Sequence, residues 1–197
     1  MKRQAELIQA MSDKEVIIHL YLTQLLLLFL SFIIGLFFFD WKSFGQLWQF
    51  SFHDVIVYGA GSGLIVLIVN FLLMRYLPEN WYDDGGVNEK IFQTRSIPHI
   101  FFLCLLIAFS EEILFRGVIQ TNFGLVMASI IFAVLHVRYL SKMFLFIVVV
   151  LLSFFLGYVY ELTHSLWVTI FSHFLIDFVL AVKIRFDYLQ SKRKEQY

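Results

Sequence analysis

Long apolar segments follow one another along almost the whole chain, and they constrain its fold more than any other feature. A helix needs about 20 mostly apolar residues to cross the hydrocarbon core of a membrane. Six candidate segments lie at about 16–39, 54–77, 98–119, 124–140, 143–160 and 165–182. We therefore predict an all-α fold: a polytopic bundle of about six transmembrane helices that forms a single integral membrane domain over residues 1–197. Small residues at 59–63 predict close helix packing inside this bundle.

The composition agrees with a membrane protein. The chain is 60% hydrophobic and only 15% charged, which excludes an ordinary soluble domain. If both termini are cytosolic, only Lys42 and Arg116 of the 15 Lys and Arg residues lie outside cytosolic segments. This asymmetry follows the positive-inside rule, so we expect a multi-pass protein with both termini in the cytosol. Its expected surroundings are the lipid bilayer, and nucleic acid is not an expected partner.

Charged side chains inside the apolar segments are the strongest pointer to function. Glu111, Glu112 and Arg116 lie in the third segment, where each charge costs about 2.5–3.5 kcal/mol on insertion scales. Polar residues also interrupt the fourth and sixth segments. The three clusters are Glu111-Glu112-x-x-x-Arg116, Phe132-x-x-x-His136 and His173-x-x-x-Asp177. Because intramembrane acids are functional candidates by default, we interpret the clusters as parts of one site that holds water.

Helical spacing separates the two glutamates. Residues four apart share a helix face, so Glu112 and Arg116 are predicted to pair within their helix. Glu111 is turned by about 100° from Glu112 and faces a different neighbour. The two carboxylates are therefore expected to have different roles, with histidines of other helices as the partners of Glu111.

The order and spacing of the three clusters resemble the CAAX protease and bacteriocin-processing family, which includes the type II CAAX prenyl endopeptidases. The resemblance covers about residues 98–182. It implies an intramembrane endopeptidase in the plasma membrane of a bacterium, which hydrolyses a peptide bond with glutamate-activated water. It also implies a peptide or protein substrate that is lipid-modified or anchored in the membrane.

The resemblance implies a role for each matching residue. Glu111 is the expected general base, and His136 is expected to hold the water. His173 is the expected donor to the developing oxyanion, while Arg116 holds Glu112. The predicted catalytic residues are Glu111, Glu112, Arg116, His136, His173 and Asp177.

Asp177 departs from the prenyl endopeptidases, which carry Asn at the matching position. An ionised carboxylate cannot donate to an oxyanion, so a direct oxyanion contact does not suit Asp177. Three alternatives follow: a protonated Asp177, an Asp177 that orients His173, or a metal ligand.

The favoured mechanism requires no cofactor. A zinc site is the alternative, because His136, His173 and Glu111 would form an N,N,O ligand set with an open position. The chain lacks an H-E-x-x-H motif, and its four-residue spacing pairs glutamate with arginine instead of histidine with histidine. These features favour the metal-free mechanism.

Two other function classes fit part of the pattern. One is a non-catalytic membrane protein of bacteriocin immunity or regulation that keeps the family site without turnover. The other is a proton-coupled carrier, since buried acids and histidines also form proton relays. The six segments show no repeated halves, which argues against the carrier.

Overall fold

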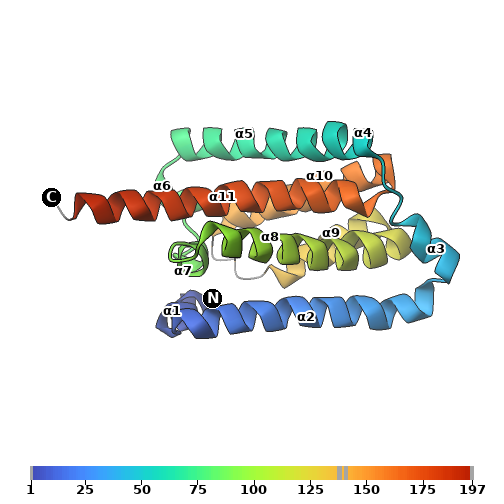
Figure 1. The fold of residues 1–197 in the computed structure, drawn as a ribbon, viewed down its shortest axis with the longest axis horizontal. Helices are drawn as coiled ribbons and strands as arrows, with labels where there is room; N and C mark the ends of the chain where they lie inside the picture. Colours follow the sequence, from blue (N-terminus) through green and yellow to red (C-terminus); the bar gives the residue numbers. More distant parts are fainter. Residues whose placement is uncertain (1, 137–138, 140–141, 196–197) are drawn as a thin grey trace.

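The computed structural model describes residues 2–136, 139 and 142–195. Long helices form a bundle, with short helices at its two ends (Figure 1). The helices are α1 (Lys2–Ala10), α2 (Asp13–Phe38), α3 (Trp41–Gln46), α4 (Phe52–Asp54), η1 (Val55–Ala60), α5 (Gly61–Tyr76), α6 (Glu79–Tyr82), α7 (Val87–Phe92), α8 (Ile97–Glu112), η2 (Ile113–Gln120), α9 (Thr121–Leu135), α10 (Met143–Thr163) and α11 (Leu166–Lys194). Among the described residues, five helical stretches are long and apolar enough to cross a membrane. The predicted all-α membrane bundle is confirmed.

The third predicted segment and most of the fourth lie in one of these stretches, Ile97–Leu135, which folds back on itself at Gly124 so that α9 packs against η2. Gly124 has φ 81° and ψ 165°, a conformation outside the helical region. The rings of Phe115 and Phe132, on either side of it, are only 4.7 Å apart between centroids. Two helical arms therefore replace one straight helix, and the expected count of about six passes holds approximately. The end of the fourth segment, residues 137, 138 and 140, lies outside the described residues.

Two segments are π-helices, in which backbone hydrogen bonds span five residues and widen the turn. One is η1, and the other is η2, which follows Glu112 directly and carries Arg116. Seven of the eight η2 residues, 114–120, are buried. The Thr121 hydroxyl donates to the Arg116 carbonyl at 2.9 Å, where the π-helix returns to an α-helix. Such segments are frequent at functional sites, and this one lies beside the predicted acidic pair.

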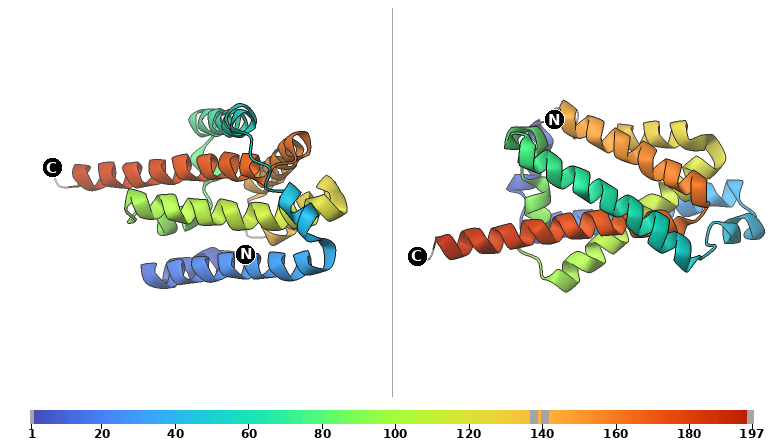
Figure 2. Two further views of the ribbon diagram at one scale, coloured as in Figure 1. Left: turned by 45° about the vertical axis from the view of Figure 1, so that its right-hand side comes forward. Right: turned by 90° about the horizontal axis from the view of Figure 1, so that it is seen from above.

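Helix α11 runs between α5 and α8 (Figures 1 and 2). On the α5 side, a Cβ added to Gly59 would lie 3.0 Å from the Val168 carbonyl oxygen. A Cβ added to Gly63 would lie 3.0 Å from a Leu175 methyl group. The hydroxyls of Ser62 and Ser172 are 2.8 Å apart. The predicted close packing at 59–63 is confirmed, and it fixes one side of α11.

Both described ends of the chain lie at the same end of the bundle, here called the terminal end (Figure 1). There the Gln9 amide donates to the Gly85 carbonyl at 3.2 Å, and Lys90 pairs with Asp13 at 3.5 Å. These contacts tie α1 and the start of α2 to the segment before α8. The two ends thus lie together at one end of the bundle, and a cytosolic location for that end stays a prediction from the charge asymmetry.

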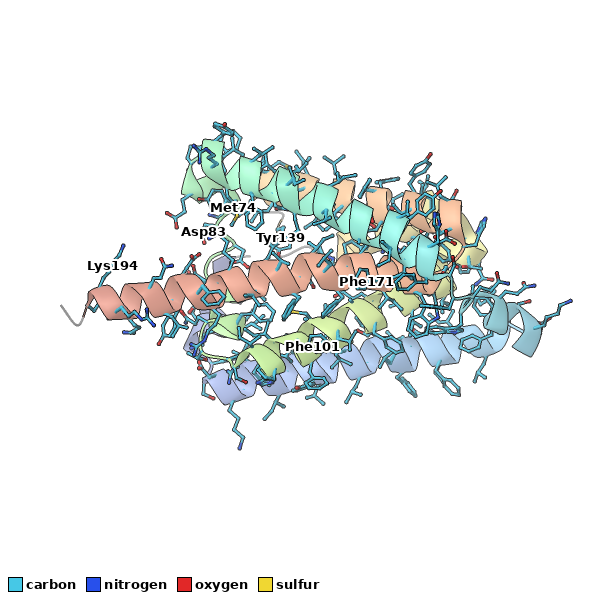
Figure 3. All side chains as sticks on the ribbon, turned by 45° about the horizontal axis from the view of Figure 1, so that its top comes forward. Met74, Asp83, Phe101, Tyr139, Phe171 and Lys194 are labelled. Atoms are coloured by element: carbon cyan, nitrogen blue, oxygen red, sulfur yellow. The ribbon has the colours of Figure 1, made fainter. Side chains whose placement is uncertain are left out.

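The outer surface is largely apolar, as the side chains in Figure 3 illustrate. On α2, Phe37 is 82% exposed and Leu36 is 64% exposed. Exposed apolar patches of this extent mark contact with a membrane or another protein. The lipid bilayer accounts for them on the apolar part of α2, beyond its charged first turn.

Candidate active site

The site is centred on Glu112, the last residue of α8, whose side chain is fully buried. Its Oε1 accepts a hydrogen bond from His173 Nδ1 at 2.9 Å. Its Oε2 lies 3.3 Å from Arg116 Nε, so the predicted pair of Glu112 and Arg116 is confirmed. The Thr169 side chain of α11 also lies close to this carboxylate. A buried charge is tolerated when it is paired in this way.

Asp177 lies one turn after His173 on α11, with its Oδ2 3.5 Å from His173 Nε2. The imidazole therefore lies between two carboxylates. The side chain of Asp177 is 30% exposed, whereas that of His173 is 8% exposed. Asp177 thus lies at the edge of the network and His173 lies inside it. Of the three alternatives for Asp177, this contact agrees best with a residue that orients His173.

The sequence pattern predicts His173 as a partner of Glu111, but in the structure His173 forms its hydrogen bond with Glu112. The reason is the rotation of α8, which turns Glu112 directly toward α11. Glu111 is partly buried, and His173 and Asp177 are among the charged groups that act on its carboxylate. Its carboxylate accepts no hydrogen bond from another described residue. Glu111 therefore lies beside the network without being held by it.

Phe132 joins the second cluster to the first. Its ring stacks on the His136 ring at 4.2 Å between centroids, and the Arg116 guanidinium lies 5.5 Å from its centroid. His136 directly follows the last turn of α9 instead of lying inside a helix. His136 Nδ1 donates to the Phe132 carbonyl at 2.8 Å, because a carbonyl can only accept. A neutral His136 therefore carries its acceptor lone pair on Nε2.

Several polar residues around the network were not singled out from the sequence. Arg116 Nη2 donates to the Ser153 carbonyl of α10 at 3.1 Å. The Ser110 hydroxyl, next to Glu111, donates to Gln24 Oε1 of α2 at 2.5 Å. They could have been found from the sequence in the same way as Glu111 and Glu112, as polar residues within an apolar segment. Gln24 and Ser110 connect α2 to the site-bearing helix.

Within residues 2–136, 139 and 142–195, no three His, Cys, Asp or Glu side chains form a group that could hold a metal ion. This geometry gives no support to a ligand set of His136, His173 and Glu111, and metal dependence stays an untested prediction. The arrangement can instead supply a carboxylate base, an imidazole donor and a buried cation, which are the groups used in general acid–base catalysis.

Comparisons with known proteins extend over the same region. The family model described as type II CAAX prenyl endopeptidase Rce1-like matches residues 93–179, which include all three clusters. An uncharacterized protein of Bacillus subtilis (strain 168), YpbD, is 49% identical over 177 residues. That alignment covers 89% of this chain and 94% of the relative. No solved structure matches the chain.

Proposed function

This chain belongs to the Rce1-like family of type II CAAX prenyl endopeptidases, and from that premise we propose that it is an intramembrane endopeptidase whose water is activated by Glu111. The observation that carries the proposal is the buried network of Glu112, Arg116 and His173 directly beside Glu111. A structural ion pair explains Glu112 and Arg116. It does not explain a second carboxylate and an Asp–His contact at the same place.

In the proposed reaction, Glu111 removes a proton from water as the water oxygen attacks the peptide carbonyl carbon. His136 positions this water. The carbonyl oxygen becomes an oxyanion, which a doubly protonated His173 stabilises by donating from Nε2, the nitrogen that faces Asp177. The intermediate then collapses, the C–N bond breaks, and the proton held by Glu111 passes to the departing amine.

The remaining residues position these groups. Glu112 accepts the Nδ1 hydrogen of His173 and so fixes the orientation of the ring. Arg116 balances the charge of Glu112. Asp177 faces the opposite nitrogen of the ring and takes the role of an orienting residue, so that no protonated Asp177 is required.

The proposed substrate is a peptide or protein held in the membrane by a lipid or an apolar helix. Asp177 is the most exposed residue of the network, so we expect the substrate to reach the site on the side where Asp177 lies. Asn at this position accompanies prenyl substrates in the relatives that this chain resembles. We therefore expect an apolar anchor to suffice, without a specific need for an isoprenoid.

Cleavage of membrane-anchored reporter peptides by the purified chain in liposomes tests this proposal. The panel contains prenylated, acylated and helix-anchored reporters. We expect cleavage by the wild type, none by Glu111→Gln, and unchanged cleavage by Glu79→Gln, which changes an exposed glutamate of α6. Full cleavage by Glu111→Gln would refute the catalytic assignment. Reporter binding without cleavage by the wild type would instead support a non-catalytic family member.

A further inference from the structure

Two polar side chains of η2 reach across to α10, beyond the network around Glu112. Arg116 Nη2 donates to the Ser153 carbonyl at 3.1 Å, and Gln120 Nε2 donates to the Gly157 carbonyl at 2.7 Å. The two donors are four residues apart on η2, and the two acceptors are four residues apart on α10. Arg116 and Gln120 therefore lie one turn apart along the same contact between the two helices, here called the η2–α10 seam.

Among the described residues, buried polar atoms of both side chains lack a hydrogen-bond partner; Arg116 Nε is one of them, but it contacts the Glu112 carboxylate at 3.3 Å. Arg116 Nη1 and Gln120 Oε1 have no hydrogen-bond partner in the described part of the chain. Arg116 is 1% exposed and Gln120 is 4% exposed, so bulk water does not satisfy either atom. The hydrogen bond to the Gly157 carbonyl fixes the amide orientation of Gln120, because only its nitrogen can donate. The seam thus presents an unsatisfied donor and an unsatisfied acceptor.

We propose that the η2–α10 seam binds one buried water molecule between Arg116 and Gln120. The water accepts from Arg116 Nη1 and donates to Gln120 Oε1. An anion is a poor ligand here, because it would face the Gln120 carbonyl oxygen and the nearby Glu112 carboxylate. A cation is a poor ligand because it would face the guanidinium. Water is neutral and supplies both kinds of hydrogen bond, as buried waters do between unsatisfied polar groups.

Gly157 and Glu161 make this site accessible to water. A Cβ at position 157 would lie 2.8 Å from Gln120 Oε1 and would collide with a methyl group of Leu125, so glycine keeps the seam open. One turn further on, Gln120 Nε2 lies 3.4 Å from Oε1 of Glu161, which is exposed near the end of α10. Polar groups therefore continue from the proposed water to the surface opposite the terminal end.

The proposed water does not depend on peptide hydrolysis. It gives a hydrogen-bond partner to Nη1 of a guanidinium at bilayer depth, where unsatisfied donors are costly. Through the pair of Arg116 with Glu112, it supports the side of the site that holds His173. A family member without catalytic activity would bind it equally well.

A high-resolution experimental structure of the full chain in a lipid nanodisc tests the proposal. We expect an ordered water within about 2.7–3.2 Å of both Arg116 Nη1 and Gln120 Oε1. A direct contact between these two atoms, or an apolar side chain between them, would overturn it. This measurement uses the wild type, so failure of a variant to fold does not affect it.

A variant pair gives a second measurement. Gln120→Met keeps the side-chain length but removes the acceptor, so we expect the water to disappear and the Tm in detergent to fall by roughly 2–4 °C or more. Gln190→Met changes an exposed glutamine of α11 and is expected to leave both unchanged. An ordered water that persists at the same position in Gln120→Met would contradict the role of Gln120.

Discussion

Replacing Gly124 with alanine tests the hairpin that joins η2 to α9. An added Cβ at Gly124 would meet no atom within 4 Å, so packing contributes nothing to the expected penalty. The penalty comes from φ 81° and ψ 165°, a backbone region that residues other than glycine rarely adopt. We expect a loss of about 1–3 kcal/mol in the free energy of unfolding. We also expect lower peptidase activity, because the turn places Phe132 and His136 relative to Arg116.

Gly61 provides the matched control for this measurement. An added Cβ there also meets no atom within 4 Å, but Gly61 has helical angles, φ −59° and ψ −49°. Gly61→Ala should therefore be neutral or stabilising by up to about 1 kcal/mol. Unfolding in mixed micelles by titration with SDS, followed by circular dichroism, measures both variants. If Gly124→Ala is as stable as Gly61→Ala, the turn is not held in the conformation described.

Three further predictions concern the buried charges, the helix contact and metal dependence. Arg116→Met should lower the free energy of unfolding by about 3–5 kcal/mol, since it leaves Glu112 buried without a cation. Adding Glu112→Gln should recover most of that loss, and equal stability of the single and double variants would count against the pair. Gly59→Leu forces a side chain against the Val168 backbone and should cost about 1–3 kcal/mol in the same titration, whereas Gly45→Leu, with open space around it, should not. Dialysis against a chelator should leave reporter cleavage unchanged, and loss of cleavage that zinc restores would favour the metal-dependent mechanism.

The positions of the membrane-spanning helices could be predicted, because the length of an apolar segment is a local property of the sequence. The break between the third and fourth segments was predicted near the correct place. The sharp turn at Gly124 was not, because a glycine in an apolar run is equally consistent with close helix packing. The π-helix η2 was also not predicted. Its buried polar side chains, Arg116 and Gln120, form hydrogen bonds with α10, which is distant in sequence, so local spacing gave no sign of it.

Within the site, the pair of Glu112 and Arg116 could be predicted because four-residue spacing brings side chains together on one helix. The partner of His173 could not, because it depends on how α8 and α11 are rotated against each other. That rotation is set by packing along both helices, including the contacts of Gly59 and Gly63 on the far side of α11. The roles of the six predicted catalytic residues remain predictions for the cleavage assay.

The folded-back stretch from α8 to α9 also sets a mechanical condition on the site. His136 is 12 residues from Gly124 along α9, a lever arm of about 18 Å. A rotation of about 5° at Gly124 would move His136 by about 1.6 Å relative to η2, given that arm length. A misplacement of this size can lower an enzymatic rate by about 100-fold. The aromatic contact between Phe115 and Phe132 holds the two arms together between Gly124 and the site. A substitution of either phenylalanine would therefore change the distance between Glu111 and His136, although neither of these two residues is altered.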